Sequence, residues 1–413
     1  MMQREIDEFW MRRAIQLAQN GELTAHPNPM VGAVIVTPPA PRAGGEECTA
    51  SEGPSGFVVS APPVRGAGGV GRILGEGYHH AAGEPHAEVM AVRNVRPQDL
   101  ALLPQSTIYV TLEPCAHYGR TPPCAELLIR NHVGRVVVGC VDPFTKVGGR
   151  GITMLREAGI DVTVGVLREE CLYLIRHFIC AQTMRRPFIT LKWARSADGF
   201  IDRRRTSLEA DGPAARLSTP LTQIHVHHLR AAHQAILVGR KTLELDHPSL
   251  NVRHYGGRSP LRCVLGSVGE EALNAGYQAY ADIDSLLEGL RREGVQSLLV
   301  EGGSQTLQSF IERDLWDEAW EEHSEITLTP PAPRARLEET LATARTGGAD
   351  TAANEEPSKD EVTAPLHHRE GQGVGLVPAP EMPLCFKPER EMHFGVEFYH
   401  WKSPVLQKHY VDF

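Results

Sequence analysis

Three metal-binding side chains and one nearby carboxylate stand out in the first half of the sequence. His86 and Glu88 are separated by a single residue, and Cys115 and Cys124 follow downstream with eight residues between them. One imidazole and two thiolates form a three-ligand set for zinc, which leaves the fourth coordination position to water. An open position is typical of catalytic zinc, because the bound water ionises near neutral pH. Glu88 is close to a ligand without being needed as one, so we expect it to carry protons between the water and a leaving amine.

The spacing of these residues indicates the kind of reaction. A His-x-Glu pair followed by Pro-Cys and a second Cys is typical of zinc-dependent nucleobase deaminases, whose usual spacer between the cysteines is two residues. Here Pro114 precedes Cys115, but the spacer is eight residues long. We expect Cys115 at the start of a helix and Cys124 one loop later, with both thiolates converging on one metal. A structural zinc site is the alternative, and it would need a fourth protein ligand from His117 or Cys140.

Alternating strands and helices must bring these residues together. Strands are expected at 30–36, 107–112, 135–139 and 161–164, with one more beginning at 72, and helices at 5–20, 87–94, 123–132, 151–158 and 167–181. Alternation of this kind predicts a sheet with helices on its faces. We expect these elements to form a first domain over residues 1–182.

A second alternating set begins after Pro187. Strands are expected at 188–193, 235–238, 262–265 and 297–300, helices at 220–231, 283–293 and 304–313, and a final aromatic strand at 392–401 that returns to the same sheet. We expect this set to form a second α/β domain over residues 187–413.

Two stretches of unusual composition interrupt these domains. Residues 37–71 contain 8 Gly and 6 Pro, a share above that at which low-complexity sequence is suspected. Residues 327–385 contain no Ile, Phe, Tyr or Trp. Neither stretch can supply a hydrophobic core, so we expect both to be loop inserts. The remaining 319 of the 413 residues are enough for two globular domains.

Five segments of the first domain resemble the deaminase half of the bifunctional deaminase/reductase family of riboflavin biosynthesis. They are Asn28-Pro-x-Val-Gly32, Gly75-Glu-Gly-Tyr-His79, Glu84-Pro-His-Ala-Glu88, the segment from Thr111 to Cys124, and Asp142-Pro-x5-Gly-Arg-Gly151. The eight-residue spacer between the cysteines is that family's own pattern. The resemblance implies a cytidine-deaminase-like α/β/α sandwich, with Asn28 and His79 near the substrate.

Segments of the second domain resemble the reductase half of the same family, which has a dihydrofolate-reductase-like α/β fold and uses NADPH. They are Phe188-Ile-Thr-Leu-Lys192, Ser196-Ala-Asp-Gly199, Leu229-Arg230, Ala235-Ile-Leu-Val-Gly239, Asp246-His-Pro-Ser-Leu-Asn-Val-Arg253 and Val300-Glu-Gly-Gly-Ser304. No Gly-x-Gly-x-x-Gly fingerprint is present, so NADPH is implied by the resemblance alone.

The resemblance also implies roles for individual residues of this domain. Substrate contacts are expected from Arg230, Leu250, Arg253 and Glu301, and NADPH contacts from Ala194, Thr242, Asp246, Ser267 and the loop formed by Gly303, Ser304, Gln305 and Thr306. The guanidinium fork of the arginines matches the oxygens of a phosphate. Bare glycine amides at a helix N-terminus can approach a diphosphate, although a tight strand-to-helix turn would give the same motif.

One segment departs from the family. Many members carry Gly-x-Ser-x-Trp-Ile-Ser/Thr before the helix expected at 220–231, whereas this chain has Gly212-Pro-Ala-Ala-Arg-Leu-Ser218. The missing serine and tryptophan leave open the alternative of a deaminase with a degenerate reductase domain. Four histidines at 225, 227, 228 and 233 do not share one helix face, so we expect them to be solvated or partly buried and not to bind a metal.

Together, these features imply two consecutive reactions of riboflavin biosynthesis. In the first domain, zinc hydroxide would deaminate 2,5-diamino-6-ribosylamino-4(3H)-pyrimidinone 5′-phosphate. In the second domain, NADPH would reduce the ribosyl group and give 5-amino-6-(5-phosphoribitylamino)uracil.

Charge and composition exclude other classes of function. A net charge of −9, without basic and aromatic tracts, is unlike a nucleic-acid deaminase of the tRNA or DNA kind. No apolar run approaches the ~18 residues of a membrane span, and the N-terminus is amphipathic and unlike a signal peptide. We therefore expect a cytoplasmic enzyme with a small-molecule substrate, reduced cysteines, and assembly as a homo-oligomer.

Overall fold

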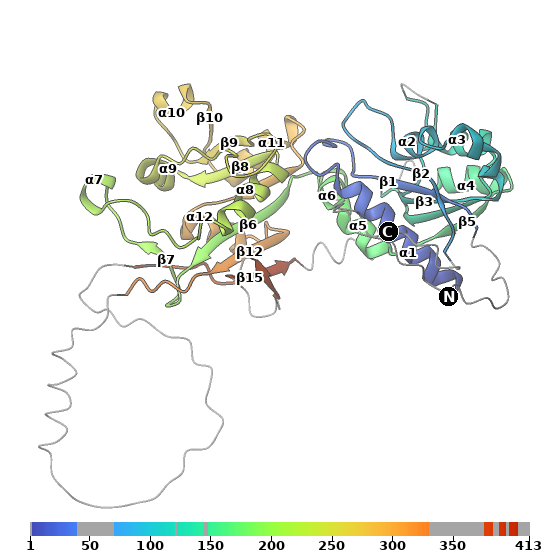
Figure 1. The fold of residues 1–413 in the computed structure, drawn as a ribbon. Coiled ribbons are helices and arrows are strands. Elements are labelled where there is room, and N and C mark those ends of the chain that lie inside the picture. The colour runs from blue at the N-terminus through green and yellow to red at the C-terminus, as the bar shows by residue number, and fades with distance from the viewer. Residues whose placement is uncertain are drawn as a thin grey trace, which may run out of the picture.

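The computed structural model describes residues 2–38, 70–119, 122–143, 148–329, 376–382, 388–393 and 396–403. Within them the chain forms two lobes, each built on its own sheet, with α1 to α6 in the first and the elements from β6 onward in the second (Figure 1). Most of the stretches 37–71 and 327–385 lies outside the described residues.

The first lobe contains a five-stranded sheet with the order β2-β1-β3-β4-β5. Its strands are β1 (Gly32–Val36), β2 (Ile73–Tyr78), β3 (Thr107–Leu112), β4 (Arg135–Cys140) and β5 (Asp161–Val164). β1 is antiparallel to β2 and β3, while β3, β4 and β5 run parallel. The paired strands β1 and β2 flank the stretch 37–71, which therefore connects neighbouring antiparallel strands, as expected.

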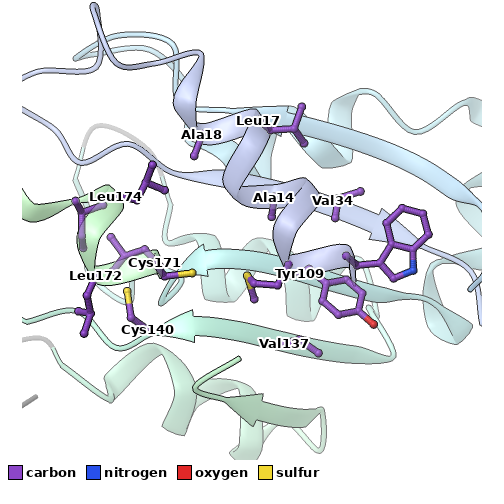
Figure 2. Close-up of a cluster of buried hydrophobic side chains, with 14 of the residues drawn as sticks. Ala14, Leu17, Ala18, Val34, Tyr109, Val137, Cys140, Cys171, Leu172 and Leu174 are labelled. Carbon is purple, nitrogen blue, oxygen red and sulfur yellow. The ribbon is translucent and has the colours of Figure 1, made fainter. Parts of the chain in front are cut away.

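Helices cover both faces of this sheet. One face carries α1 (Gln3–Gln19), α5 (Arg168–Leu174) and α6 (Arg176–Thr183), and the other carries α2 (Ala87–Arg93), α3 (Cys124–Arg130) and α4 (Arg150–Glu157). A 3₁₀ segment, η1 (Pro97–Gln105), precedes β3. Figure 2 shows Ala14 and Ala18 of α1 above the sheet, with Cys171 of α5 beside Cys140 at the end of β4. The α/β/α sandwich agrees with the sequence prediction, but the single helix expected at 167–181 is two helices that meet at Ile175.

Close backbone contacts fix two helices of this lobe against the sheet. A Cβ atom on Gly32 would lie 2.0 Å from the carbonyl oxygen of Ala14, so α1 can cross β1 only because residue 32 is glycine. A Cβ atom on Gly75 would lie 2.2 Å from the carbonyl oxygen of Ala91 in α2. Glycine at these positions brings α2, which carries Glu88, directly against the strands.

The second lobe contains an eight-stranded sheet with the order β10-β9-β8-β11-β6-β12-β15-β14. Its strands are β6 (Phe188–Arg195), β8 (Ala235–Gly239), β9 (Leu261–Leu265), β10 (Tyr277–Tyr280), β11 (Ser297–Val300), β12 (Glu318–His323), β14 (Glu389–His393) and β15 (Val396–Lys402). The strands from β10 to β12 run parallel, and β15 and β14 complete the sheet with antiparallel pairing. The single strand expected at 392–401 is thus a pair of strands.

Helices pack on both faces of the second sheet. α8 (Thr222–Ala232) and α9 (Arg240–Asp246) pack on one face, α11 (Ile283–Arg292) and α12 (Ser304–Glu312) on the other, and short α7 (Leu208–Asp211) and α10 (Glu270–Asn274) lie in connections. This mixed α/β architecture confirms the fold class predicted for both halves. A strand within the stretch 327–385 was not expected, yet β13 (Leu376–Pro378) pairs with β7 (Phe200–Arg203).

Candidate functional site

The three candidate zinc ligands come from three neighbouring elements of the first lobe. His86 is the extended residue directly before α2, Cys115 lies in the loop after β3, and Cys124 is the first residue of α3. The prediction that Cys115 begins a helix was therefore wrong, because Cys124 holds that place. Pro123 before Cys124 is compatible with a helix start, since its missing N–H would have no partner there in any case.

The distances between the ligand atoms fit a tetrahedral zinc ion. His86 Nδ1 lies 3.6 Å from Cys115 Sγ and 3.3 Å from Cys124 Sγ. Zinc–sulfur bonds of about 2.3 Å and a zinc–nitrogen bond of about 2.0 Å at a tetrahedral angle place such atoms about 3.6 Å apart. Within the described part of the chain, the group holds these three ligands and no fourth.

Neither candidate for a fourth ligand joins the group. His117 is exposed, and the buried Cys140 thiol donates to the Thr111 carbonyl oxygen at 3.3 Å. Three protein ligands are the number found in catalytic zinc sites. The arrangement favours a catalytic over a structural metal.

Electrostatics within the group favour a thiolate. Contacts with Cys124 and His86 lower the pKa of Cys115. The contact with Cys115 raises the pKa of Cys124, since the two thiols share one proton more easily than they lose both. The hydrogen bond with Cys115 raises the pKa of His86.

Glu88 lies in the first turn of α2 and is 3% exposed. Burial raises the pKa of Glu88 to about 7, although the nearby His86 opposes this shift. Its carboxyl group also hydrogen-bonds the Cys124 thiol, so it lies beside the metal ligands. A carboxyl group poised near neutral pH can both accept and release a proton, as general acid–base catalysis requires.

The structure brings Asn28 and His79 together next to the ligand group. His79 Nδ1 lies 3.1 Å from the carbonyl oxygen of Pro85, which can only accept, so the proton is on Nδ1. Nε2 then accepts a hydrogen bond from Asn28 Nδ2 at 3.0 Å. Burial lowers the pKa of His79, consistent with a neutral ring. The His79 and His86 rings meet edge to face, with centroids 5.6 Å apart.

The residues expected to bind substrate and NADPH in the second lobe gather at one edge of its sheet. Parallel strands end at the same edge, and this edge is where ligands of open α/β sheets bind. The expected residues lie at the ends of β6 (Ala194) and β9 (Ser267), after β11 (Glu301), in α9 after β8 (Thr242 and Asp246), and at the start of α12 (Gly303, Ser304, Gln305 and Thr306). Residues 304–306 form the first turn of α12, in agreement with the helix expected at 304–313.

A largely but not fully buried ion pair joins two of the expected substrate residues. Arg230 Nε and Nη2 donate to the two carboxylate oxygens of Glu301 at 2.9 and 2.6 Å, and Nη1 donates to the Asn251 carbonyl oxygen at 3.3 Å. Burial alone would raise the pKa of Glu301, but the Arg230 guanidinium outweighs this effect and the pKa is lowered. Both residues are therefore charged and fixed in position.

Arg253 and Leu250 lie on the loop beside this pair. The Arg253 side chain is exposed and hydrogen-bonds Ser249 and Asn251, while its backbone N–H donates to His227 Nδ1 at 2.9 Å. Leu250 is buried and has a φ of 49°, an unusual conformation for a branched residue. An exposed guanidinium above a rigid loop is suited to meet a phosphate from solvent.

Asp246, expected to contact NADPH, forms an ion pair with Arg205. The Arg205 guanidinium lies 2.7 Å from Asp246 at the end of α9 and 2.7 Å from Asp202 in β7. Sequence reasoning missed Arg205, because its two partners lie on different elements. A run of three arginines at 203–205 was the available signal.

The start of α12 packs tightly against two glycines. A Cβ atom on Gly239 would lie 2.5 Å from Thr306 Oγ1, and one on Gly302 would lie 2.7 Å from Thr306 Cβ. The ends of β8 and β11 therefore approach α12 with no side chains between them. The glycines therefore let the first turn of α12 sit directly against the ends of the two strands.

Sequence reasoning also missed the buried carboxylate of Glu322 near the carboxyl end of β12. Glu322 of β12 accepts hydrogen bonds from the hydroxyls of Ser218 and Thr222, both at 2.6 Å, and from Lys192 Nζ at 3.5 Å. Ser218 belongs to the segment that departs from the family pattern, and its hydroxyl donates to Glu322 near the end of β12. The lysine was visible in the Phe188–Lys192 motif, but its partner lies 130 residues away.

The histidines at 225, 227, 228 and 233 have separate environments. His227 and His233 are buried, which corrects the expectation of solvated or partly buried side chains. His233 Nε2 lies 2.8 Å from Thr190 Oγ1, and His228 Nε2 lies 2.8 Å from Glu22 of the first lobe. His225 packs against the rings of Trp320 and Phe398.

Comparison with known sequences gives matches in both lobes. Residues 4–140 match the family described as the cytidine and deoxycytidylate deaminase zinc-binding region, and residues 187–320 match the RibD C-terminal domain. The riboflavin biosynthesis protein RibD of Aquifex aeolicus (strain VF5) is 33% identical over 348 residues, which cover 76% of this chain and 86% of that protein. The chain belongs to the RibD family. Another member, RibD of Escherichia coli (strain K12), is 40% identical over 274 residues, or 63% of each chain.

Solved RibD structures share the whole architecture. Acinetobacter baumannii RibD, form 1, is 26% identical with a TM-score of 0.67, and the match covers 97% of this chain and 99% of that one. The diaminohydroxyphosphoribosylaminopyrimidine deaminase/5-amino-6-(5-phosphoribosylamino)uracil reductase of Thermotoga maritima is 27% identical with a TM-score of 0.69 and the same coverage.

Family membership confirms the resemblance found in the sequence motifs. The chain is a bifunctional enzyme of riboflavin biosynthesis, in which a deaminase domain of the zinc-binding kind is followed by a reductase domain. None of the helices in the described part of the chain has the length and apolar character that a bilayer crossing requires.

Proposed function

We propose that the deaminase domain acts on 2,5-diamino-6-ribosylamino-4(3H)-pyrimidinone 5′-phosphate. The three-ligand group of His86, Cys115 and Cys124, with buried Glu88 beside it, is the observation that carries this proposal. A zinc ion held there would supply a Lewis acid that lowers the pKa of water towards neutrality.

The remaining steps of deamination fall to side chains of this chain. Glu88 takes a proton from the attacking water and passes it to the ring nitrogen. It then takes the remaining hydroxyl proton of the tetrahedral adduct and gives it to the amino group, which leaves as ammonia as the C–N bond breaks and the C=O bond forms. Asn28 positions the pyrimidine through its amide oxygen, because its amide nitrogen is already bonded to His79. His79 fixes that orientation, since its own Nδ1–H is committed to the Pro85 carbonyl.

For the reductase domain we propose reduction at C1′ of the opened ribosyl group. Ring opening breaks the bond from C1′ to the ring oxygen, moves the N–H proton to that oxygen and forms a C1′=N bond; NADPH would supply the hydride to C1′, and solvent the proton to the nitrogen. Arg230, Leu250, Arg253 and Glu301 would bind the substrate, with the exposed Arg253 guanidinium on its phosphate. The residues that would hold NADPH at the carboxyl edge of the sheet are Ala194, Thr242, Asp246, Ser267, Gly303, Ser304, Gln305 and Thr306. The bare glycines and the first turn of α12 would face its diphosphate, since helix N-termini attract anions. The cofactor supplies the hydride, so the protein contributes mainly positioning.

Mass spectrometry of the products tests both activities in one experiment. The purified full chain is supplied with the diamino pyrimidine phosphate, with and without NADPH. We expect loss of ammonia in both samples and the ribitylamino product only with NADPH. No loss of ammonia would contradict the deaminase proposal, and deamination without NADPH oxidation would contradict the reductase proposal and favour a degenerate second domain.

Four further expectations from the sequence stay predictions. They are the domain limits 1–182 and 187–413, assembly as a homo-oligomer, a cytoplasmic location, and the absence of a nucleic-acid partner. Light scattering of the full chain tests the oligomer directly. Folding of a fragment that ends at residue 182 would support the first domain limit.

A further inference from the structure

A buried carboxylate lies beside the metal ligands without reaching them. Glu113 is 6% exposed and follows β3, two residues before Cys115. Its backbone N–H donates to the Cys140 carbonyl oxygen at 2.9 Å, which continues the pairing of β3 with β4. The proposed deamination gives this side chain no role. A buried carboxylate needs compensating partners, so its contacts show what it does.

Four backbone N–H groups converge on the Glu113 carboxylate. Oε2 accepts from Gly149 at 2.8 Å and from Asp142 at 3.2 Å. Oε1 accepts from Gly151 at 2.8 Å and from Ile152 at 3.4 Å. Hydrogen bonds to an ionised acceptor are stronger than those to a neutral one. One side chain after β3 therefore holds the backbone of a segment about thirty to forty residues further along the chain.

Three of these amides, those of Gly149, Gly151 and Ile152, belong to the beginning of α4, and that of Asp142 lies just after β4. The first N–H groups of a helix have no partner inside the helix, and a side chain just before the helix usually accepts from them. Here the residue before α4 is Gly149, which has no side chain and a φ of +82°. Glu113 provides the missing acceptor from another element, and its negative charge suits the positive end of the helix dipole.

The same end of α4 touches the backbone of the metal-binding loop. A Cβ atom on Gly151 would lie 2.0 Å from the carbonyl oxygen of Pro114, so α4 and this loop are in direct backbone contact. A glycine is required at position 151 for that approach. Residue 114 is therefore fixed between the Glu113 anchor and the Cys115 ligand.

The other side of the loop is fixed by α3. The N–H of Ala125 donates to the Cys115 carbonyl oxygen at 3.2 Å, and the N–H of Cys124 donates to Cys115 Sγ at 3.3 Å. The segment from Glu113 to Cys115 thus lies between the first turns of two helices. Contacts with α3 act on the ligand itself, and contacts with α4 act through Glu113.

We propose that Glu113 is a positioning residue of the zinc site. Its carboxylate anchors the loop to α4 and thereby fixes the position from which Cys115 reaches the metal. The proposal rests on the proposed zinc site, but it assigns a residue that touches neither metal nor substrate. Groups that orient metal ligands without binding the metal typically change metal affinity 10- to 100-fold when removed.

Zinc affinity of the Glu113→Gln variant of the full chain tests this role. Glutamine keeps the size of the side chain but replaces one acceptor oxygen with an NH₂ group, which cannot accept. One pair of amides, either Asp142 with Gly149 or Gly151 with Ile152, would lose its acceptor. Competition with a chromophoric chelator should show a zinc dissociation constant raised about tenfold or more. After loading with Co²⁺, the thiolate-to-cobalt absorption bands should shift, because Cys115 no longer holds its position.

Asp7→Asn is the matched control. Asp7 is another buried carboxylate of the same lobe, and it accepts hydrogen bonds from Arg135 at 2.8 and 2.9 Å and from Tyr109 at 2.8 Å. Its loss should lower the thermal midpoint and leave the zinc dissociation constant within twofold of the parent value. The two variants together separate general destabilisation from an effect on the metal site.

A second variant covers the case in which Glu113→Gln does not fold. Gly151→Ala pushes the loop away from α4 at Pro114 and leaves every donor and acceptor in place, so it should weaken zinc binding in the same direction.

An unchanged zinc dissociation constant and unshifted cobalt bands, with only a lower thermal midpoint, would overturn the positioning role. Failure of the unmodified chain to bind zinc would instead contradict the proposed function, so the two failures are distinguishable.

Discussion

The two active regions of this enzyme are built in different ways. In the deaminase domain, three ligand atoms and a buried glutamate lie within two short motifs, and the ends of α2 and α3 bring them together. In the reductase domain, the candidate residues are spread from Ala194 to Thr306 and meet only because parallel strands end at a common edge.

The way charge is compensated differs as well. Near the candidate zinc site, the buried Glu113 is bonded to backbone amides, and Glu88 has its pKa raised to about 7 by burial. At the reductase edge, partly buried carboxylates are paired with cations, as in Arg230–Glu301 and Arg205–Asp246. The first arrangement suits proton transfer, and the second suits binding a charged substrate without moving protons. A substitution in one region should therefore change the reaction of that domain and leave the other reaction unchanged.

The largest effect is expected from Glu88→Gln. The amide cannot exchange protons, so kcat for deamination should fall about 10³-fold, within the range known for general acid–base groups. Zinc content should remain, because Glu88 is not a ligand. Reduction of the deaminated intermediate, supplied directly, should be unchanged.

A matched control for this variant is Glu126→Gln. Glu126 lies two residues from Cys124, as Glu88 lies two residues from His86, but it bonds Tyr118 and Arg130 outside the ligand group. Deamination by this variant should stay within twofold of the parent rate. Loss of zinc from Glu88→Gln would show that the glutamate had been assigned wrongly.

The next largest effect is expected from Arg230→Met. It leaves the Glu301 carboxylate buried without its cation, a change that costs about 3 kcal/mol or more in stability. Loss of a charged contact in a binding site separately costs about 3 kcal/mol of binding free energy, so the reductase kcat/KM should fall about 10²-fold. Deamination should not change, because the zinc-binding residues lie in the other lobe.

A double variant separates stability from binding in this pair. Replacing both Arg230 and Glu301 with apolar residues of similar size removes the unpaired charge, and such replacements are often neutral for stability. Unfolding in urea should therefore return towards the parent curve while reductase activity stays low. Recovery of activity would show that the pair has only a structural role.

The contrast between the regions also explains what could be predicted from the sequence. The zinc ligands and Glu88 were predicted because their chemistry depends on residue types at short spacing. The four backbone amides that donate to Glu113 were not predicted, because their position depends on how the chain after Asp142 folds back beside the end of β3. The Arg205–Asp246 and Lys192–Glu322 pairs join residues 41 and 130 positions apart, and no local pattern indicates them.

The strands that were missed have a similar cause. β12 contains Glu318, Glu321 and Glu322, and the strand looks polar until their partners are known. All three glutamates are buried and lie next to Arg176, Trp193 or Lys192. Hydrophobic alternation fails as a signal wherever a sheet buries paired charges. The break at Ile175 is likewise not marked by a proline or glycine, and Ile175 itself is buried in the core of the first lobe.

A smaller effect is expected from the pH dependence of stability in the reductase domain. Burial lowers the pKa of His233 to about 4, although the hydrogen bond with the Leu229 carbonyl opposes this shift. The unfolded chain takes up a proton near pH 6.5, whereas the folded domain does so only near pH 4. Stability is therefore complete above about pH 6.5 and falls as the pH drops towards 4, by roughly 3 kcal/mol for this residue.

Urea unfolding followed by tryptophan fluorescence measures this dependence. Four of the five tryptophans, at 193, 316, 320 and 401, lie in the reductase domain and report on it. His233→Gln should make the loss of stability between pH 6.5 and 4 shallower than in the parent. Burial also lowers the pKa of His227 to about 4, so the variant should keep the part of the pH dependence of stability that His227 causes. Identical slopes would contradict the assignment of a neutral buried ring to His233.

The smallest effect is expected where the two lobes meet near solvent. His228 of α8 lies 2.8 Å from Glu22 of the first lobe, and both side chains remain about one third exposed. Exposed pairs of this kind contribute about 0.5 kcal/mol, and Glu22→Gln should lower stability by no more than that. The buried pair between Arg176 and Glu318 is the stronger polar link, and it stays intact in this variant.

Glu22→Gln therefore tests whether the two regions act independently. Glu22 precedes Asn28 on the same loop, and His228 precedes Arg230 on the same helix, so this contact links the surroundings of both candidate substrate sites. If the sites are as separate as their construction indicates, deamination and reduction should each keep their rates within twofold. The measurement compares each rate with and without the other site's substrate. A variant that slowed one reaction only when the other substrate was present would show that this contact couples the two sites. The two regions would then differ in how they are built but would not act independently.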